Sequence, residues 1–257
     1  LNVPATADEA RRAGCLLHGT GGGAGARNLL LLAGGNLATQ VRATTGGRVR
    51  LVLLFRAHGW PAGTAAQDLE ALDVAFFEGS QDPDLTFHVR ASGFEGDDPD
   101  DEPRLQFRDA RLRDGWLDTE PTTFAVPLSV PNGPVLPLGL ASARLTGRVA
   151  VDGPGFRIDD GAIAGYVTRE TARDLVEDVK TACAGEQPPG ICQLIGGQIG
   201  SPTDELVDTV IGLAGGFDAH VDPLTGPAAC APGGACDALA VCLDLRAIGV
   251  SVAGVEE

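Results

Sequence analysis

The chain has 257 residues, 44% of them hydrophobic and 21% charged, and its 35 acidic residues outnumber its 19 basic ones to give a net charge of −16. This balance argues against nucleic acid or an anionic lipid surface as a partner, because their phosphates repel an acidic protein. No apolar run approaches the roughly 20 residues of a membrane-spanning helix, so we expect no transmembrane segment. The composition is typical of a folded globular protein.

Three features of the sequence predict an exported protein. The chain contains six cysteines and no methionine, and it begins at Leu1 instead of an initiator. A mature chain that has lost its signal peptide has these properties. Because Leu1 is not a cysteine, we expect no lipid anchor. The expected location is extracellular, on the cell surface or in the periplasm, where cysteines form disulfide bonds.

The chain is predicted to consist of an N-terminal arm and one domain. Residues 1–25 end in a glycine-rich run, and glycine loses the most entropy on ordering, so they are predicted to form an arm or loop. Residues 26–257 are predicted to form a single β-rich domain with a helical insertion at about 168–215. Apolar residues recur at helical spacing over Arg27–Val41, which predicts an N-terminal helix.

Alternation of apolar and polar residues predicts antiparallel strands in the middle of the chain, because only antiparallel sheets commonly leave one face wet. The alternating runs are 85–90, 104–108 and 143–149. Residues 48–56 have an apolar centre and predict a strand buried on both faces. Turn signals separate these runs at Asp82-Pro83, Asn132-Gly133 and Asp152-Gly153-Pro154. The predicted fold is mainly β, an antiparallel sandwich or partly open barrel with the N-terminal helix and a two-helix, disulfide-linked insertion.

Two helices are predicted after the strands, each with a recognisable start. Thr168 is the expected N-cap of a helix that ends near Cys183, and Ser201 before Pro202 is the expected start of the second. Cys183 and Cys192 are close enough in sequence to predict a local disulfide. We expect the helices to cover one end or one face of the sheet.

The C-terminal region is predicted to form a strand whose exposed face changes. Apolar residues alternate over 239–245, and the apolar phase then moves to Ile248, Val250 and Val252. An extra residue in a strand has this effect, which predicts a β-bulge near Ala247 to Gly249.

The remaining cysteines predict a link between the two ends of the chain. Cys230, Cys236 and Cys242 form a second cluster, and Cys15 is expected to pair with one of them. Six cysteines allow about 15 pairings, among which the sequence does not choose.

An acidic loop is the candidate metal site. Its carboxylates are hard oxygen ligands of the kind that Ca²⁺ prefers. The candidate calcium ligands are Asp97, Asp98, Asp100, Asp101 and Glu102. The loop lacks the ordered spacing of a calcium-binding loop, and the alternative is a solvated acidic loop. No other cofactor is expected.

Catalytic motifs are incomplete in this sequence. The Leu16–Gly22 segment resembles the oxyanion loop of α/β-hydrolases, but no serine lies in a Gly-x-Ser-x-Gly frame. The four histidines are scattered and show no metal-ligand spacing. They are His18, His58, His88 and His220. Asp159-Asp160-Gly161 is predicted to form a turn between strands.

Two segments, Asp159–Thr168 and Cys236–Ala247, resemble stretches of uncharacterised exported or lipid-anchored β-rich proteins from high-GC environmental bacteria. The resemblance covers about a fifth of the chain and implies export and β structure, without an activity. In those proteins the second stretch often follows a loop that looks calcium-binding. Here that position reads Asp222-Pro223-Leu224-Thr225-Gly226 and continues through two cysteines, which implies that the metal site is lost or replaced by cross-links.

We therefore expect a non-enzymatic exported protein of the surface or periplasm, which acts by binding a protein partner or by self-assembly. A hydrolase whose site is assembled only in three dimensions is one alternative. A structural subunit of an extracellular fibre is the other.

Overall fold

The computed structural model describes residues 52–60, 68–129, 135–152, 155–185, 188, 192, 196–213, 216–222, 224, 226–230 and 235–256. Several predicted features lie outside these residues. They are the N-terminal arm, the helix at Arg27–Val41, Cys15, His18 and the Asn132-Gly133 turn.

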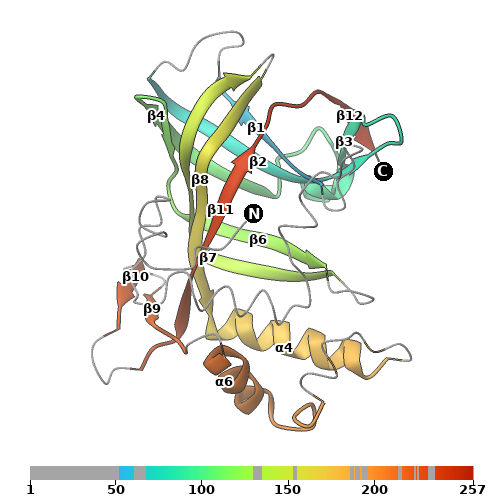
Figure 1. The fold of residues 1–257 in the computed structure, drawn as a ribbon, viewed down its shortest axis with the longest axis vertical. Helices are drawn as coiled ribbons and strands as arrows, with labels where there is room; N and C mark the ends of the chain where they lie inside the picture. Colours follow the sequence, from blue (N-terminus) through green and yellow to red (C-terminus); the bar gives the residue numbers. More distant parts are fainter. Residues whose placement is uncertain are drawn as a thin grey trace.

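Among the described residues, twelve strands form one large sheet that is mostly antiparallel and not closed (Figure 1). This confirms the predicted mainly β fold, for which a sandwich or a partly open barrel was expected. The strands are β1 (Val52–His58), β2 (Leu69–Gln81), β3 (Phe87–Arg90), β4 (Leu105–Arg113), β5 (Trp116–Asp118), β6 (Thr122–Ser129), β7 (Val135–Asp152), β8 (Gly155–Thr168), β9 (Ala219–Asp222), β10 (Gly226–Ala229), β11 (Ala238–Ala247) and β12 (Val252–Glu256). Their order is β10-β9-β11-β8-β7-β5-β4-β2-β3-β12, while β1 pairs with β2 and β6 with β7.

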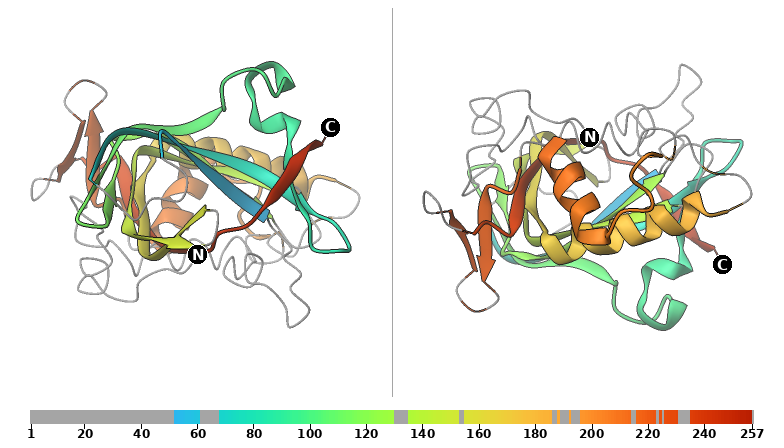
Figure 2. Two further views of the ribbon diagram at one scale, coloured as in Figure 1. Left: turned by 90° about the horizontal axis from the view of Figure 1, so that it is seen from above. Right: turned by 90° about the horizontal axis from the view of Figure 1, so that it is seen from below.

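Irregular residues inside the long strands let the sheet coil into a trough (Figures 1 and 2). Ala71, Asp109 and Ser142 have positive φ angles of 61°, 52° and 48°, and the pairing registers of β2 with β4 and of β7 with β8 shift beside them. Such bulges bend a strand and increase its twist. They also change which face a side chain takes, which is why the predicted run at 104–108 continues to Arg113 in a new phase.

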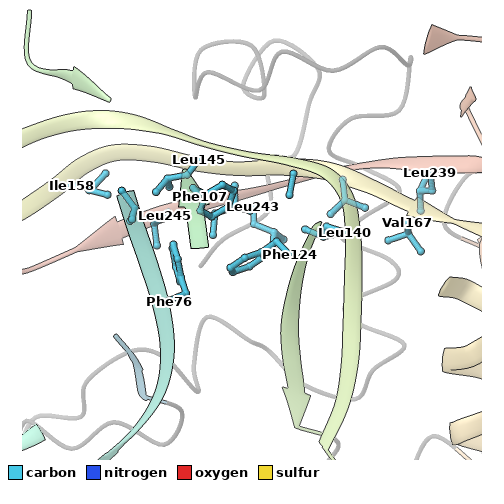
Figure 3. Close-up of a cluster of buried hydrophobic side chains, with 14 of the residues drawn as sticks. Phe76, Phe107, Phe124, Leu140, Leu145, Ile158, Val167, Leu239, Leu243 and Leu245 are labelled. Carbon is cyan, nitrogen blue, oxygen red and sulfur yellow. The ribbon is translucent and has the colours of Figure 1, made fainter. Parts of the chain in front are cut away.

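The core lies on the inner side of this trough (Figure 3). Phe76, Phe107 and Phe124 pack with ring centroids 5.0 to 5.7 Å apart. They lie against aliphatic side chains of the long strands, including Leu145 of β7 and Leu243 of β11. Burial of this surface from water is the main stabilising contribution to the fold.

Two α-helices, α4 (Arg169–Cys183) and α6 (Thr203–Leu213), close one end of the trough (Figure 1). The Thr168 Oγ1 accepts a hydrogen bond from the Thr171 N–H at 3.2 Å, which confirms the predicted N-cap. The second helix begins at Thr203, just after the predicted Ser201-Pro202 start. Buried residues of both helices belong to the same core as the sheet. They are Ala172, Val176, Val179, Leu206, Val207 and Ile211.

The two helices are also joined by ion pairs, and a disulfide ties the end of α4 to the segment that follows it. Arg169 lies 2.8 Å from Asp208, and Arg173 lies 3.3 Å from Asp204. The disulfide Cys183–Cys192 is present as predicted. No helix among the described residues is long and apolar enough to cross a membrane.

The predicted turn at Asp159-Asp160-Gly161 is wrong, because these residues lie inside β8. Gly161 pairs with Gly147 of β7, and a Cβ on either glycine would lie 2.6 Å from Ile158 Cγ2. The glycine is therefore needed for a close approach of two strands. Arg157 pairs with Asp159 at 3.1 Å.

Two strand predictions are corrected at their ends. Leu85 was expected on the buried face of a strand, but it is exposed in the β2–β3 hairpin with a φ angle of 74°. The register of β11 with β8 shifts between Leu245 and Ala247, so the irregularity lies before the predicted position. The chain leaves the strand after Ala247 and starts β12 at Val252.

Candidate functional site

The acidic loop forms a defined arch between β3 and β4. It contains two short 3-10 turns, η1 (Ala91–Gly93) and η2 (Glu95–Asp97). The Glu95 N–H donates to the Glu102 carbonyl at 2.9 Å, and the Phe94 ring lies 5.0 Å from the Phe77 ring between centroids. Backbone pairing and an aromatic contact therefore hold the arch to the sheet.

Two of the five candidate calcium ligands pair with arginines. Asp97 lies 2.9 Å from an Arg104 guanidinium nitrogen, and Glu102 pairs with Arg108. The Asp98 side chain accepts a hydrogen bond from the Asp100 N–H at 3.0 Å, which closes a local turn. Within the described ranges, no three His, Cys, Asp or Glu side chains gather closely enough to hold a metal ion. Calcium binding here stays a prediction.

Two histidines have aspartate partners in the structure. His88 Nε2 lies 3.1 Å from Asp82 Oδ2 across the β2–β3 hairpin. His220 Nδ1 of β9 lies 2.7 Å from Oδ2 of Asp237, the residue before β11. The other oxygen of Asp237 accepts the Val221 N–H at 3.0 Å. Strand topology creates both pairs, and the spacing of the residues gave no signal of them.

The His220–Asp237 pair lies where β9 and β11 begin to separate. The two strands pair at one position, Ala238 with Ala219. Beyond it, Asp237 accepts the Val221 N–H, and Asp218 accepts the Ala240 N–H at 2.8 Å. These carboxylates accept hydrogen bonds from backbone N–H groups that have no partner in the β9–β11 pairing, which is a structural role. In the contacts of both His220 and His88, the partner of the histidine is an aspartate and not a nucleophilic side chain.

Opposite charges alternate across the outer face of the central sheet. Glu70 of β2 contacts Arg111 and Arg113 of β4, and Glu120 contacts Arg111 and Arg144 of β7. We call these five residues the ion-pair ladder. Glu70 raises the pKa of Arg113 by accepting its hydrogen bonds and by its negative charge. Each ladder member is at least two-fifths exposed, so the pairs keep the face hydrated and add little stability.

The segment 248–256 differs from the rest of the surface. Seven large hydrophobic residues are exposed in the described ranges, and four belong to this segment. They are Ile248 (74%), Val250 (37%), Val252 (45%) and Val255 (41%). Residues 248–255 include no charged side chain and no proline. We call 248–256 the C-terminal edge segment.

Strand β12 forms the regular part of this segment. It pairs in parallel with β3, the last neighbour on its side of the sheet (Figure 1). The residues Val252 to Val255 are exposed on both faces of the strand, so β12 covers no part of the core. Its attachment to the sheet is the backbone pairing with β3, which is only a four-residue strand.

The opposite end of the sheet is protected. Strand β10 contains Pro227, which lacks an N–H for a further ladder, and Cys230 just after it is bonded to Cys236. This pair uses two members of the predicted cysteine cluster. Cys242 of β11 is also disulfide-bonded and fully buried. Cys15, which was predicted to pair with one member of this cluster, lies outside the described residues.

Comparison of the chain with models of known families, with curated proteins and with solved structures finds no match.

Proposed function

We propose that the protein acts in an oxidising, non-cytoplasmic compartment by binding another protein chain through its C-terminal edge segment. The disulfides Cys183–Cys192 and Cys230–Cys236 support the compartment, because such bonds persist where thiols are not kept reduced. We further propose that the bound chain is a copy of the protein itself, so that binding is self-association.

The observation that carries this proposal is the gathering of exposed apolar residues on one segment that has no charged side chain from 248 to 255. Ile248, Val250, Val252 and Val255 lie within a few residues of one another in a chain whose net charge is −16. Single exposed hydrophobic residues are normal, whereas a contiguous group marks an interaction surface. Burial of such residues against a partner is favourable by about 25 cal/mol for each Å² of apolar surface removed from water.

Sedimentation velocity of the full chain tests the proposal, from about 1 μM to about 1 mM, the range in which weak protein contacts dissociate. The sedimentation coefficient of the wild type should rise with concentration. Ile248→Asp should reduce this rise, because it replaces an exposed apolar side chain of the segment with a charged one. Ile248 lies outside β12, so the substitution leaves the strand itself unchanged. Leu224→Asp is the matched control, since Leu224 is 94% exposed and lies outside the segment. A wild type that stays monomeric over the whole range overturns the proposal.

Hydrolysis is a second candidate function, which the His220–Asp237 pair favours. A carboxylate bonded to Nδ1 orients an imidazole so that Nε2 acts as a general base. His220 is about half exposed, so its ring is open to solvent. Screening of ester, peptide and glycoside substrates with the wild type and His220→Gln tests this function. A hydrolytic rate that His220→Gln does not lower removes it.

A further inference from the structure

We propose that β12 pairs antiparallel with β12 of a second copy, so that two sheets join into one across a two-fold axis. This inference rests on the self-association proposed above, and it names the strand, the orientation and the register of the contact.

One edge of β12 has no partner among the described strands. On one side its backbone pairs with β3, from Val252 opposite Phe87 to Glu256 opposite Arg90. No other described strand pairs with β12. An edge strand presents unpaired N–H and C=O groups that accept a further strand, and proteins usually protect such edges with charges or proline. Between Val252 and Val255 neither is present.

The orientation proposed for the contact is antiparallel. Identical strands that pair antiparallel are related by a two-fold axis, so one contact satisfies both copies and the assembly closes as a dimer. With Gly254 on the axis, all of β12 overlaps its copy, and Val252 faces Glu256 of the other chain. This register places no two acidic residues opposite each other. Each copy contributes one carboxylate to the contact, that of Glu256, and it lies opposite the apolar Val252, so the repulsion between the two acidic molecules is kept low here.

The proposed contact is symmetric and does not form an open chain. A head-to-tail assembly would join β12 of one copy to β10 of the next and would grow into a fibre. Pro227 removes a donor from β10, and the Cys230–Cys236 bridge follows that strand immediately. These features make β10 a poor acceptor for a further strand. The contact between two β12 strands has no such obstacle.

The size of the contact predicts its strength. One short strand on each copy buries less than the roughly 1,200 Å² of a stable interface. We therefore expect a reversible dimer with a dissociation constant of about 10 μM to 1 mM.

Opposite charges placed at Val252 test the register. In the proposed dimer Val252→Asp faces Glu256 of the other copy at two symmetric positions, and Val252→Lys faces the same carboxylate with the opposite charge. Val252→Asp should raise the dissociation constant about tenfold, while Val252→Lys should leave it unchanged or lower it. Leu224→Asp serves as the control for added charge, and circular dichroism verifies that each variant folds.

Hydrogen exchange gives a second measurement. Amide protection over residues 252–256 should increase with protein concentration in the wild type and in Val252→Lys. If the wild type associates but Asp and Lys at position 252 weaken it equally, or neither changes it, the antiparallel β12 contact is wrong while self-association stands. If the wild type associates without limit as concentration rises, the assembly is an open chain and the two-fold contact is wrong. A monomeric wild type removes both proposals.

Discussion

The ion-pair ladder and the C-terminal edge segment both lie on exposed parts of the sheet, but the ladder exposes charged side chains and the segment exposes apolar ones. On β4, buried Ala110 and Leu112 alternate with the exposed Arg111 and Arg113, whose guanidiniums pair with Glu70 of the next strand. On β12 the side chains of both faces are exposed, and Val252 and Val255 have no charged residue between them. β4 packs its apolar side chains against the core and exposes charged ones, whereas β12 has no core to cover and exposes apolar side chains on both faces.

The largest expected effect tests whether β4 is packed against a core and β12 is not. Phe107→Ala removes a fully buried ring of β4 and should lower the free energy of unfolding by about 3–5 kcal/mol. Val255→Ala should change it by less than about 0.5 kcal/mol, because that side chain contacts no core. Urea denaturation measures both. A comparable loss from the two substitutions would mean that β12 is packed as tightly as β4.

A smaller effect is expected from a change that touches neither region. Loss of the Cys183–Cys192 bridge in the double variant Cys183→Ser/Cys192→Ser should lower the free energy of unfolding by about 2–3 kcal/mol, because the unfolded chain gains freedom. Concentration-dependent sedimentation should stay as in the wild type. If self-association were lost as well, the helical end of the molecule would contribute to the contact.

Removal of charges from the ion-pair ladder should make the outer face of the central sheet prone to association, as proposed for the C-terminal edge segment. The double variant Arg111→Val/Arg144→Val leaves valines on exposed strand positions, where this residue type is well tolerated, so stability should change by less than about 1 kcal/mol. The outer face would then expose apolar side chains, and light scattering should report new association. Arg56→Val, on β1 and outside the ladder, is the matched control. A clear solution at high concentration would show that the ladder charges do not protect the face.

Added salt should have opposite effects on the ion-pair ladder and on self-association through the C-terminal edge segment, and both effects should be smaller still. Glu70→Gln removes the acceptor shared by Arg111 and Arg113, and its loss of stability should shrink as sodium chloride is added, because salt screens exposed pairs. Self-association through the uncharged edge should instead strengthen, since salt screens the repulsion between two acidic copies. Urea midpoints and sedimentation at low and high salt measure the two trends. If salt weakened self-association as well as the contribution of Glu70 to stability, the contact between copies would depend on charge pairs too.

The smallest effect concerns pH at the β2–β3 hairpin beside the edge. Hydrogen bonds from Thr86 lower the pKa of Asp84. A lowered pKa in the folded state means that Asp84 contributes stability above its unfolded pKa and loses the contribution as pH falls through the folded value. The melting temperature of the wild type should therefore fall more than that of Asp84→Asn between about pH 6 and pH 2.5. Equal falls would show that the turn makes no contribution.

The sequence predicts those parts of the molecule that local chemistry determines. The Thr168 N-cap depends on neighbouring residues only, and the Cys183–Cys192 bridge links residues nine positions apart. The outcome at Asp159-Asp160-Gly161 shows the limit of this approach. Its composition is typical of turns, but the contact of Gly161 with Gly147 across two long strands requires glycine for another reason.

Features that depend on pairing between distant strands were not accessible from the sequence. The His220–Asp237 pair and the ladder both arise from the order of strands in the sheet. The positive φ angle of Asp109 shifts the face of β4 in a way that no composition signal marks. In the candidate site, the sequence shows that residues 248–255 carry no charge. It does not show that both faces of β12 are exposed and lack a core contact, because this depends on where the strand lies in the sheet.

The position of β11 has a consequence for the timing of folding. This strand comes late in the chain but lies inside the sheet, between β8 and β9, and its residues Leu239, Val241 and Leu243 are almost completely buried. A growing chain that has not yet reached residue 245 leaves the inner edge of β8 unpaired and the core incomplete. The core should therefore close only after β11 has paired with β8, so the sheet cannot fold completely until this late strand is present.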